Sequence, residues 1–107
     1  DSGLSMRTYG YIADIVIMLL NILIKNNNST YNVGGRSVLS IKDLATKIGQ
    51  QMNVDVKVPA RSKPSLKGAP EFVGLNLSRI EKEFGIEKYV EIDQGLKNTI
   101  KWIRNYE

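Results

Sequence analysis

The feature that most constrains this chain is an apolar run at residues 12–24, in which 11 of 13 residues are apolar. Only Asp14 and Asn21 interrupt the run. A membrane-spanning helix needs about 20 apolar residues, so this run is too short to cross a bilayer, and no membrane insertion is expected. A helix that is apolar on all sides is normally buried on several of them. The run therefore predicts a central core helix. A helix that docks on a missing domain or partner is the alternative.

Helical periodicity and capping signals predict three further helices. Ser40 and Asp43 have the spacing of a capping box and precede a one-sided apolar stripe. The same spacing recurs from Ser78 and predicts a shorter helix that ends at Gly85. A last helix, with an apolar face of its own, is expected from near residue 92.

Strand signals are fewer than helix signals. Residues 30–33 are β-forming types before a glycine pair, residues 54–58 alternate valine with charged residues, and residues 5–11 form an extended run. We interpret the glycine pair as a turn. The sequence therefore predicts one α+β domain with about four helices and two or three short strands. Those strands are too few for an independent doubly wound sheet.

The composition excludes several kinds of active site. The 107 residues include no cysteine and no histidine, so the chain alone builds no disulfide, thiol nucleophile, Ser-His-Asp triad or Cys/His metal site. No glycine-rich nucleotide-binding motif occurs, and Glu81, Glu83 and Glu87 are interpreted as a solvated face. The net charge of +4 is scattered along the chain, so no nucleic-acid partner is expected. The absence of cysteine fits a reducing compartment, and we expect a cytoplasmic protein.

The extended run at residues 5–11 holds the first candidate binding residues. In a strand, Arg7, Tyr9 and Tyr11 would project to one face. An arginine beside aromatic rings suits a phosphate and a stacked base or sugar. The alternative is a surface arginine on an edge strand.

The second candidate region is a proline-rich basic loop at residues 59–70, which contains Arg61, Lys63 and Lys67. Such a loop can act as an anion-binding lid or can be a solvated surface loop. The residues alone leave both readings open.

Five segments that together span most of the chain carry a family resemblance. They read RTYGYIAD at 7–14, YNVGG at 31–35, SIKDLA at 40–45, NLSRI with a following FG at 76–85, and QGLKNTIKW at 94–102. In this order they are similar to R-x-F-x-Y-V-x-D, Y-N-I-G-[SG], S-I-x-E-L-A, D-x-S-K-[IA] with L-G, and E-G-L-x-x-T-I-x-W. These motifs belong to nucleotide-sugar epimerases and dehydratases, which are NAD-dependent enzymes of the extended short-chain dehydrogenase/reductase family.

The resemblance implies that the chain is the C-terminal, substrate-binding part of a dTDP-glucose 4,6-dehydratase-like or UDP-sugar epimerase-like enzyme. NAD would be bound by an N-terminal domain that carries the glycine motif and the Y-x-x-x-K catalytic pair. Neither motif occurs in this chain, so the fragment alone should bind no NAD and catalyse nothing. Because the sequence opens at Asp1 and not at a methionine, we likewise expect it to be a piece of a longer protein. A role in surface polysaccharide or O-antigen sugar synthesis is also implied.

The same resemblance implies the binding residues and partners. Arg7, with Tyr9 beside it, would contact the diphosphate of a nucleoside-diphosphate sugar. The family's second phosphate-binding arginine has no counterpart here, and Lys67, Lys63 or Arg61 would replace it. The expected partners are the protein's own N-terminal domain and further copies of itself in a homo-oligomer. A free-standing binding or oligomerisation module is the alternative function.

Overall fold

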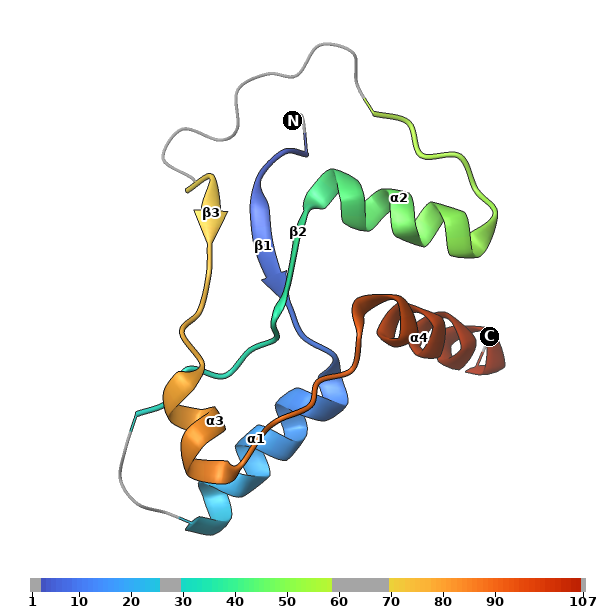
Figure 1. Cartoon of the computed structure of the whole chain (residues 1–107). Helices are drawn as coiled ribbons and strands as arrows, with labels where there is room; N and C mark the ends of the chain where they lie inside the picture. Colours follow the sequence, from blue (N-terminus) through green and yellow to red (C-terminus); the bar gives the residue numbers. More distant parts are fainter. Residues whose placement is uncertain (1–2, 26–29, 59–69, 107) are drawn as a thin grey trace.

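The computed structural model describes residues 3–25, 30–58 and 70–106 of the chain (Figure 1). The described residues confirm the α+β expectation, with four helices and a small mixed sheet. The strands are β1 (Met6–Tyr9), β2 (Ser37–Ser40) and β3 (Phe72–Val73), and the helices are α1 (Ile12–Lys25), α2 (Ile41–Met52), α3 (Ser78–Phe84) and α4 (Ile92–Tyr106).

Strand β1 lies in the middle of the sheet. It pairs antiparallel with β2 and parallel with β3, so the order is β2-β1-β3. Arg7 is opposite Leu39 on one side and Val73 on the other. Because side chains alternate along a strand, Arg7 and Tyr9 belong to one face of the sheet and Met6 and Thr8 to the other.

Two of the expected strands are not strands. Residues 30–33 form an irregular segment, in which Asn32 Nδ2 donates to the Asn76 carbonyl oxygen at 3.0 Å and Val33 packs on the core. Residues 54–58 are also irregular, because the chain turns back after α2: the Val54 N–H donates to the Gly49 carbonyl oxygen at 2.9 Å. Side-chain hydrogen bonds in the first segment and a backbone bond to the end of α2 in the second are formed in place of the ladder bonds that β-forming residue types and alternation predicted.

The caps of α2 agree with the sequence, and those of α3 agree in part. Ser40 Oγ accepts a hydrogen bond from the Asp43 N–H at 2.9 Å, and α2 ends at Asn53 in the left-handed conformation. Helix α3 ends at Gly85, which is also left-handed, as expected. The capping box from Ser78 was wrong, because Ser78 is already helical, and its N–H donates instead to Asn76 Oδ1 at 3.0 Å.

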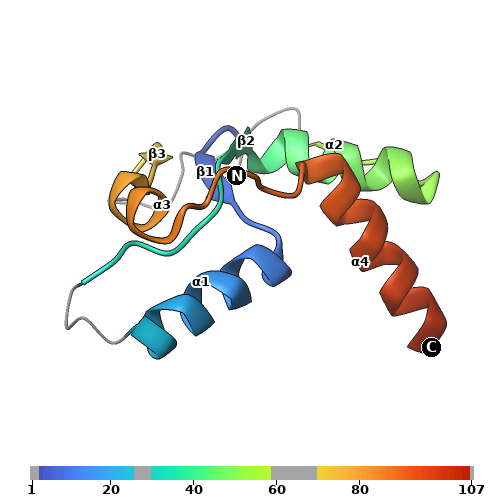
Figure 2. The ribbon, with the colours of Figure 1, turned by 60° about the horizontal axis from the view of Figure 1, so that its bottom comes forward.

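The fully buried core is small and lies between α1 and α3. Met18 and Ile80 are each 1% exposed, and Leu77 is 6% exposed. Partly buried side chains close around this trio, among them Ile22 and Phe84. Helix α2 packs instead with α4, and Figures 1 and 2 both place α1 away from α2.

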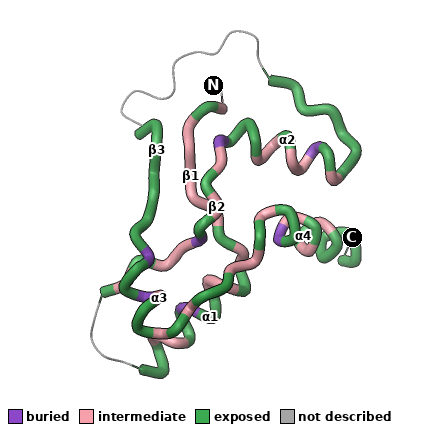
Figure 3. The backbone as a smooth tube through the Cα atoms, in the orientation of Figure 1, coloured by how far each residue is buried: buried purple, intermediate pink, exposed green. Residues whose placement is uncertain are grey.

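Helix α1 is not the central core helix that its composition predicted. Among its described residues only Met18 is fully buried, because α3 and the segments beside it cover one side of the helix (Figure 3). The outer side keeps a broad exposed apolar face, which we call the α1 outer face: Ile12, Val16, Ile17, Leu19, Leu20, Leu23 and Ile24 are each 44–79% exposed. This arrangement favours the alternative interpretation, in which α1 docks on a missing domain or on a partner.

The chain as a whole is open. Its accessible surface is 8316 Å², whereas a compact 12.0 kDa protein is expected to expose about 6,000 Å². Its radius of gyration is 16.5 Å, against about 13 Å for a compact domain of 100 residues. No helix among the described residues is long and apolar enough to span a membrane.

Candidate functional site

Arg7 lies on the central strand of the sheet, so it is not on an edge strand as the alternative reading proposed. The residue is half-buried, and its Nη1 donates to the Met6 carbonyl oxygen at 2.7 Å. A guanidinium carries five N–H groups in a planar fork. Among the described residues this hydrogen bond uses one of them, so the others keep their capacity to bind an acceptor such as a phosphate oxygen.

Tyr9 opens on a cavity of about 330 Å³ between the end of β1, α2 and α4. Tyr11 lines the same cavity, although it lies beyond the end of β1 and so outside the strand face that the alternation predicted. Its ring packs against Gly95 of α4, where an added Cβ would lie 3.2 Å from the ring. Arg7 does not line this cavity. The two tyrosines therefore share a cavity that Arg7 does not line, although Arg7 and Tyr9 lie on the same face of the sheet.

The other sequence-derived candidates, Arg61, Lys63 and Lys67, fall outside the described residues. An anion-binding lid and a solvated surface loop therefore both remain predictions for that segment. Within the described residues, no cluster of three or more acidic side chains could hold a metal ion.

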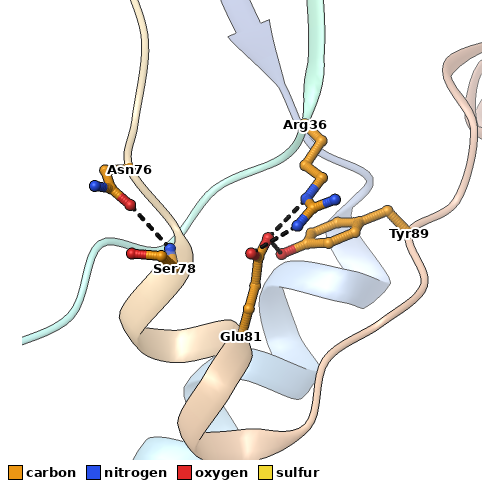
Figure 4. A network of polar contacts seen from close by, with 5 residues as sticks. All are labelled: Arg36, Asn76, Ser78, Glu81 and Tyr89. Atoms are coloured by element: carbon orange, nitrogen blue, oxygen red, sulfur yellow. Dashed lines mark hydrogen bonds and ion pairs between the residues drawn. The ribbon is translucent and has the colours of Figure 1, made fainter.

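A charged network that the sequence did not reveal joins α3 to the segments around it (Figure 4). Arg36 donates through both Nε and Nη2 to the two carboxylate oxygens of Glu81, at 2.7 Å each. Tyr89 Oη donates to Glu81 Oε1 at 2.8 Å, and the Arg36 guanidinium lies 5.4 Å from the centre of the Tyr89 ring. The solvated reading of Glu81 was wrong, since its side chain is 15% exposed.

The network shifts the ionisation of its members in consistent directions. Hydrogen bonds from Arg36 and then from Tyr89 hold the pKa of Glu81 below its ordinary value. The Glu81 carboxylate raises the pKa of Arg36 in return. Burial, followed by the hydrogen bond to Glu81, raises the pKa of Tyr89 to about 12. At neutral pH the three groups are therefore an ion pair and a neutral phenol.

The network borders a second, larger cavity of about 500 Å³. Thr8, Val38 and Phe72 line it, which places it on the sheet face opposite to Arg7 and Tyr9. Arg36 and Glu81 also line it, together with Asn76 and Ser78. No local sequence pattern connects these positions, because they come from three separated segments, at residue 8, residues 35–38 and residues 72–81.

Three curated proteins are similar to this chain along almost its whole length. They are UDP-glucuronate 4-epimerases 5, 2 and 4 of Arabidopsis thaliana, which are 27%, 26% and 26% identical to it. Each match covers 99% of this chain and 27% of the relative, so the chain spans about a quarter of their length. No family profile matches the chain, and no solved structure matches it.

These matches support the epimerase half of the resemblance seen in the motifs. The similarity is distant, and it runs through β1, where Arg7 lies, to α4. It supports a relation to nucleotide-sugar epimerases, since all three relatives are UDP-glucuronate 4-epimerases.

Proposed function

We propose that this chain is the sugar-nucleotide-binding C-terminal part of an NAD-dependent nucleotide-sugar epimerase. The observation that carries the proposal is the similarity to UDP-glucuronate 4-epimerases over 99% of the chain. The remaining length of such relatives would supply the NAD-binding domain and the catalytic residues. The chain itself would contribute binding energy at the nucleotide end of the substrate, remote from the reacting carbon. The motifs also leave open a more specific variant of this proposal. In it, the protein is a cytoplasmic nucleotide-sugar 4,6-dehydratase that acts in the synthesis of sugars for surface polysaccharides.

Arg7 is the residue that we propose contacts the diphosphate. Its position on the central strand fixes the backbone on both sides, and the hydrogen bond to the Met6 carbonyl oxygen restrains the guanidinium. A restrained, half-buried arginine loses little freedom when it binds an anion. Its planar fork suits two oxygens of one phosphate group. Arg61, Lys63 and Lys67 remain candidates for a second contact, and Tyr9 would flank the site from its own cavity.

The α1 outer face is the second part of the proposal. Seven apolar side chains at 44–79% exposure form a patch that a monomer of this size seldom presents to water. We propose that the remainder of the protein covers this face and that the protein assembles into homo-oligomers. A free-standing oligomerisation module is the competing proposal, and the α1 outer face is the observation that favours it. The coding sequence upstream separates the two, since an enzyme requires the dinucleotide glycine motif and Y-x-x-x-K within the preceding domain.

The activity test uses the complete protein with NAD and UDP-glucuronate. An epimerase yields the C4 epimer at unchanged mass, whereas a dehydratase acting on a hexose nucleotide yields a product lighter by one water. Mass spectrometry with chromatographic separation of epimers distinguishes these outcomes. Conversion of neither UDP-glucuronate nor other UDP- and dTDP-hexoses would overturn the proposed function.

The role of Arg7 is tested in the same assay. Loss of a charged hydrogen bond costs about 1.5–3 kcal/mol, so Arg7→Ala is expected to raise KM for the sugar nucleotide about tenfold or more. Arg7→Lys keeps the charge and loses the fork, and should give an intermediate KM. Arg104→Ala is the matched control, because Arg104 is an exposed arginine in the last turn of α4. Equal KM values for Arg7→Ala and Arg104→Ala would remove Arg7 from the site.

A further inference from the structure

The larger cavity, of about 500 Å³, is a site that neither the family motifs nor the relatives' names account for. It lies on the Thr8 face of the sheet, opposite to Arg7, so the diphosphate site proposed above does not include it. Its size falls within the range of about 300–1,000 Å³ that is typical of small-molecule sites. Its lining combines apolar walls with a few polar groups, which is also the usual composition of such sites.

The polar groups of this cavity are both donors and acceptors, and they are held in fixed places. Arg36 uses Nε and Nη2 on Glu81, so within the described part of the chain the N–H groups of Nη1 keep their capacity to donate. Glu81 Oε1 accepts two hydrogen bonds, from Arg36 and Tyr89, whereas Oε2 accepts one among the described residues. Asn76 Oδ1 accepts from the Ser78 N–H, which orients its amide group. The N–H groups of Arg36 Nη1, the Glu81 carboxylate and the Asn76 amide therefore border the same cavity.

The charges of this lining favour a neutral ligand over an anion. Arg36 and Glu81 form an ion pair at 2.7 Å, so their charges compensate each other. A phosphate group would meet the Glu81 carboxylate as well as the guanidinium, and like charges repel at this range. A hydroxyl group can instead accept from Arg36 and donate to Glu81 with no charge to desolvate.

The apolar side of the cavity offers one exposed ring. Phe72 on β3 is 58% exposed and lines the cavity beside Leu75 and Val38. An exposed aromatic face next to fixed planar polar groups suits a flat ring that is apolar on its faces and polar at its edge. Sugar rings have that character, because their C–H groups point to the faces and their hydroxyl groups lie around the rim.

We propose that this cavity binds the ring of a polyhydroxylated sugar. Arg36 Nη1 and Glu81 Oε2 engage a pair of neighbouring hydroxyl groups, Asn76 takes a third, and the ring packs on Phe72. The shared chemistry is a vicinal diol on a sugar ring. Its source is either the sugar nucleotide of the proposed function or a separate glycoside, and the experiment distinguishes the two.

The test measures binding to the purified complete protein by saturation-transfer NMR and calorimetry. The probes are methyl β-glucopyranoside, its 2,3-dideoxy analogue, which lacks the vicinal diol, and UDP-glucuronate. Phe72→Ala and Glu81→Gln are expected to weaken methyl glucoside binding at least fivefold. The dideoxy analogue is expected to bind at least fivefold more weakly than the glucoside to the unmodified protein.

Two matched variants serve as controls. Glu83→Gln makes the same chemical change on an exposed residue of α3 outside the cavity lining, and Arg104→Ala changes an exposed residue of α4 that is also outside it. Neither should change glucoside affinity. Phe72→Ala keeps the test valid if Glu81→Gln unfolds, because Phe72 is mostly exposed and belongs to no core cluster.

The outcomes separate this inference from the proposed function. If UDP-glucuronate is bound through Arg7 and the cavity variants leave both probes unaffected, the cavity proposal is overturned and the function stands. If the binding of methyl glucoside depends on Phe72 while UDP-glucuronate does not bind, the cavity is a separate glycoside site. The proposal that the protein binds a sugar nucleotide is then overturned. If UDP-glucuronate binding is weakened by both Arg7→Ala and Phe72→Ala, the sugar nucleotide extends from the Arg7 face round the β3 edge of the sheet, and its own sugar or ribose occupies the cavity. Absence of binding of all three probes overturns both proposals.

Discussion

The contact between Gly35 and Gly10 permits a sharp test of how the chain positions Arg7. Gly35 is buried just before β2, and its backbone lies directly against the backbone at the end of β1. A Cβ added to Gly35 would overlap the Tyr9 carbonyl oxygen and the Gly10 Cα. A Cβ on Gly10 would lie 2.8 Å from the Gly35 nitrogen. Neither backbone can move aside without breaking the pairing of β1 with β2.

The expected cost of Gly35→Ala follows from this geometry. Overpacking of a well-packed site usually costs about 1–3 kcal/mol, and the upper end applies where rigid backbone must move. We therefore expect a loss of about 3 kcal/mol or more in the free energy of unfolding. Gly85→Ala is the matched control, because it also adds one methyl group, but nothing lies within 4 Å of that Cβ. Its cost is the left-handed backbone at φ 64°, about 1–2 kcal/mol.

Urea denaturation followed by far-UV circular dichroism and Trp102 fluorescence measures both variants. A midpoint for Gly35→Ala well below that of Gly85→Ala, at similar slope, is the expected result. Where Gly35→Ala folds, the displaced strand should also weaken sugar-nucleotide binding at Arg7. Equal or smaller destabilisation by Gly35→Ala would refute the close backbone contact and the sheet geometry built on it.

Three further predictions concern a cap, the core and the charged network. Ser40→Ala should lower the free energy of unfolding by about 1 kcal/mol, because Ser40 Oγ caps α2. Thr46→Ala is the control, because it removes a hydroxyl in the middle of the same helix, and it should cost less in the same denaturation assay. Ile80→Ala should cost about 2–5 kcal/mol, because Ile80 is 1% exposed in the core, and a loss below 1 kcal/mol would contradict that packing. Because the folded pKa of Tyr89 is raised to about 12 from 10.0, its stabilising contribution should be complete below pH 10 and disappear as the pH rises toward 12. The pKa of Glu81 is lowered in the folded protein, so the stabilising contribution of this carboxylate should disappear as the pH falls into the acidic range. Thermal melts of Tyr89→Phe and Glu81→Gln across pH would check both predictions.

Helix signals were more reliable than strand signals in this sequence. Capping and periodicity are local, so the start of α2 at Ser40 and the ends at Asn53 and Gly85 could be read from neighbouring residues. The strands that form the sheet were missed in part, because β2 and β3 depend on pairing with a segment distant in the chain. The valines of residues 54–58 alternate as in a strand, yet no partner strand meets them among the described residues.

The candidate sites divide in a similar way. Arg7 could be singled out because its motif lies in one short run, and its strand was correctly placed just before the apolar helix. Its neighbours in space could not be read from that run, and Tyr11 proved to be outside the strand. The contact between Arg36 and Glu81 spans 45 residues of sequence, and no local pattern announces such a pair.

The sequence by itself determined the helices, the exclusion of cysteine and histidine chemistry, and the motif order that relates the chain to nucleotide-sugar epimerases. These features depend on residue type and on spacing within a few turns. Tertiary structure alone decided that β1 is central, that α1 buries one side and exposes the other, and that two cavities open on opposite sheet faces. The physical reason is that burial and pairing depend on which distant segment arrives beside a residue, and composition does not specify that segment.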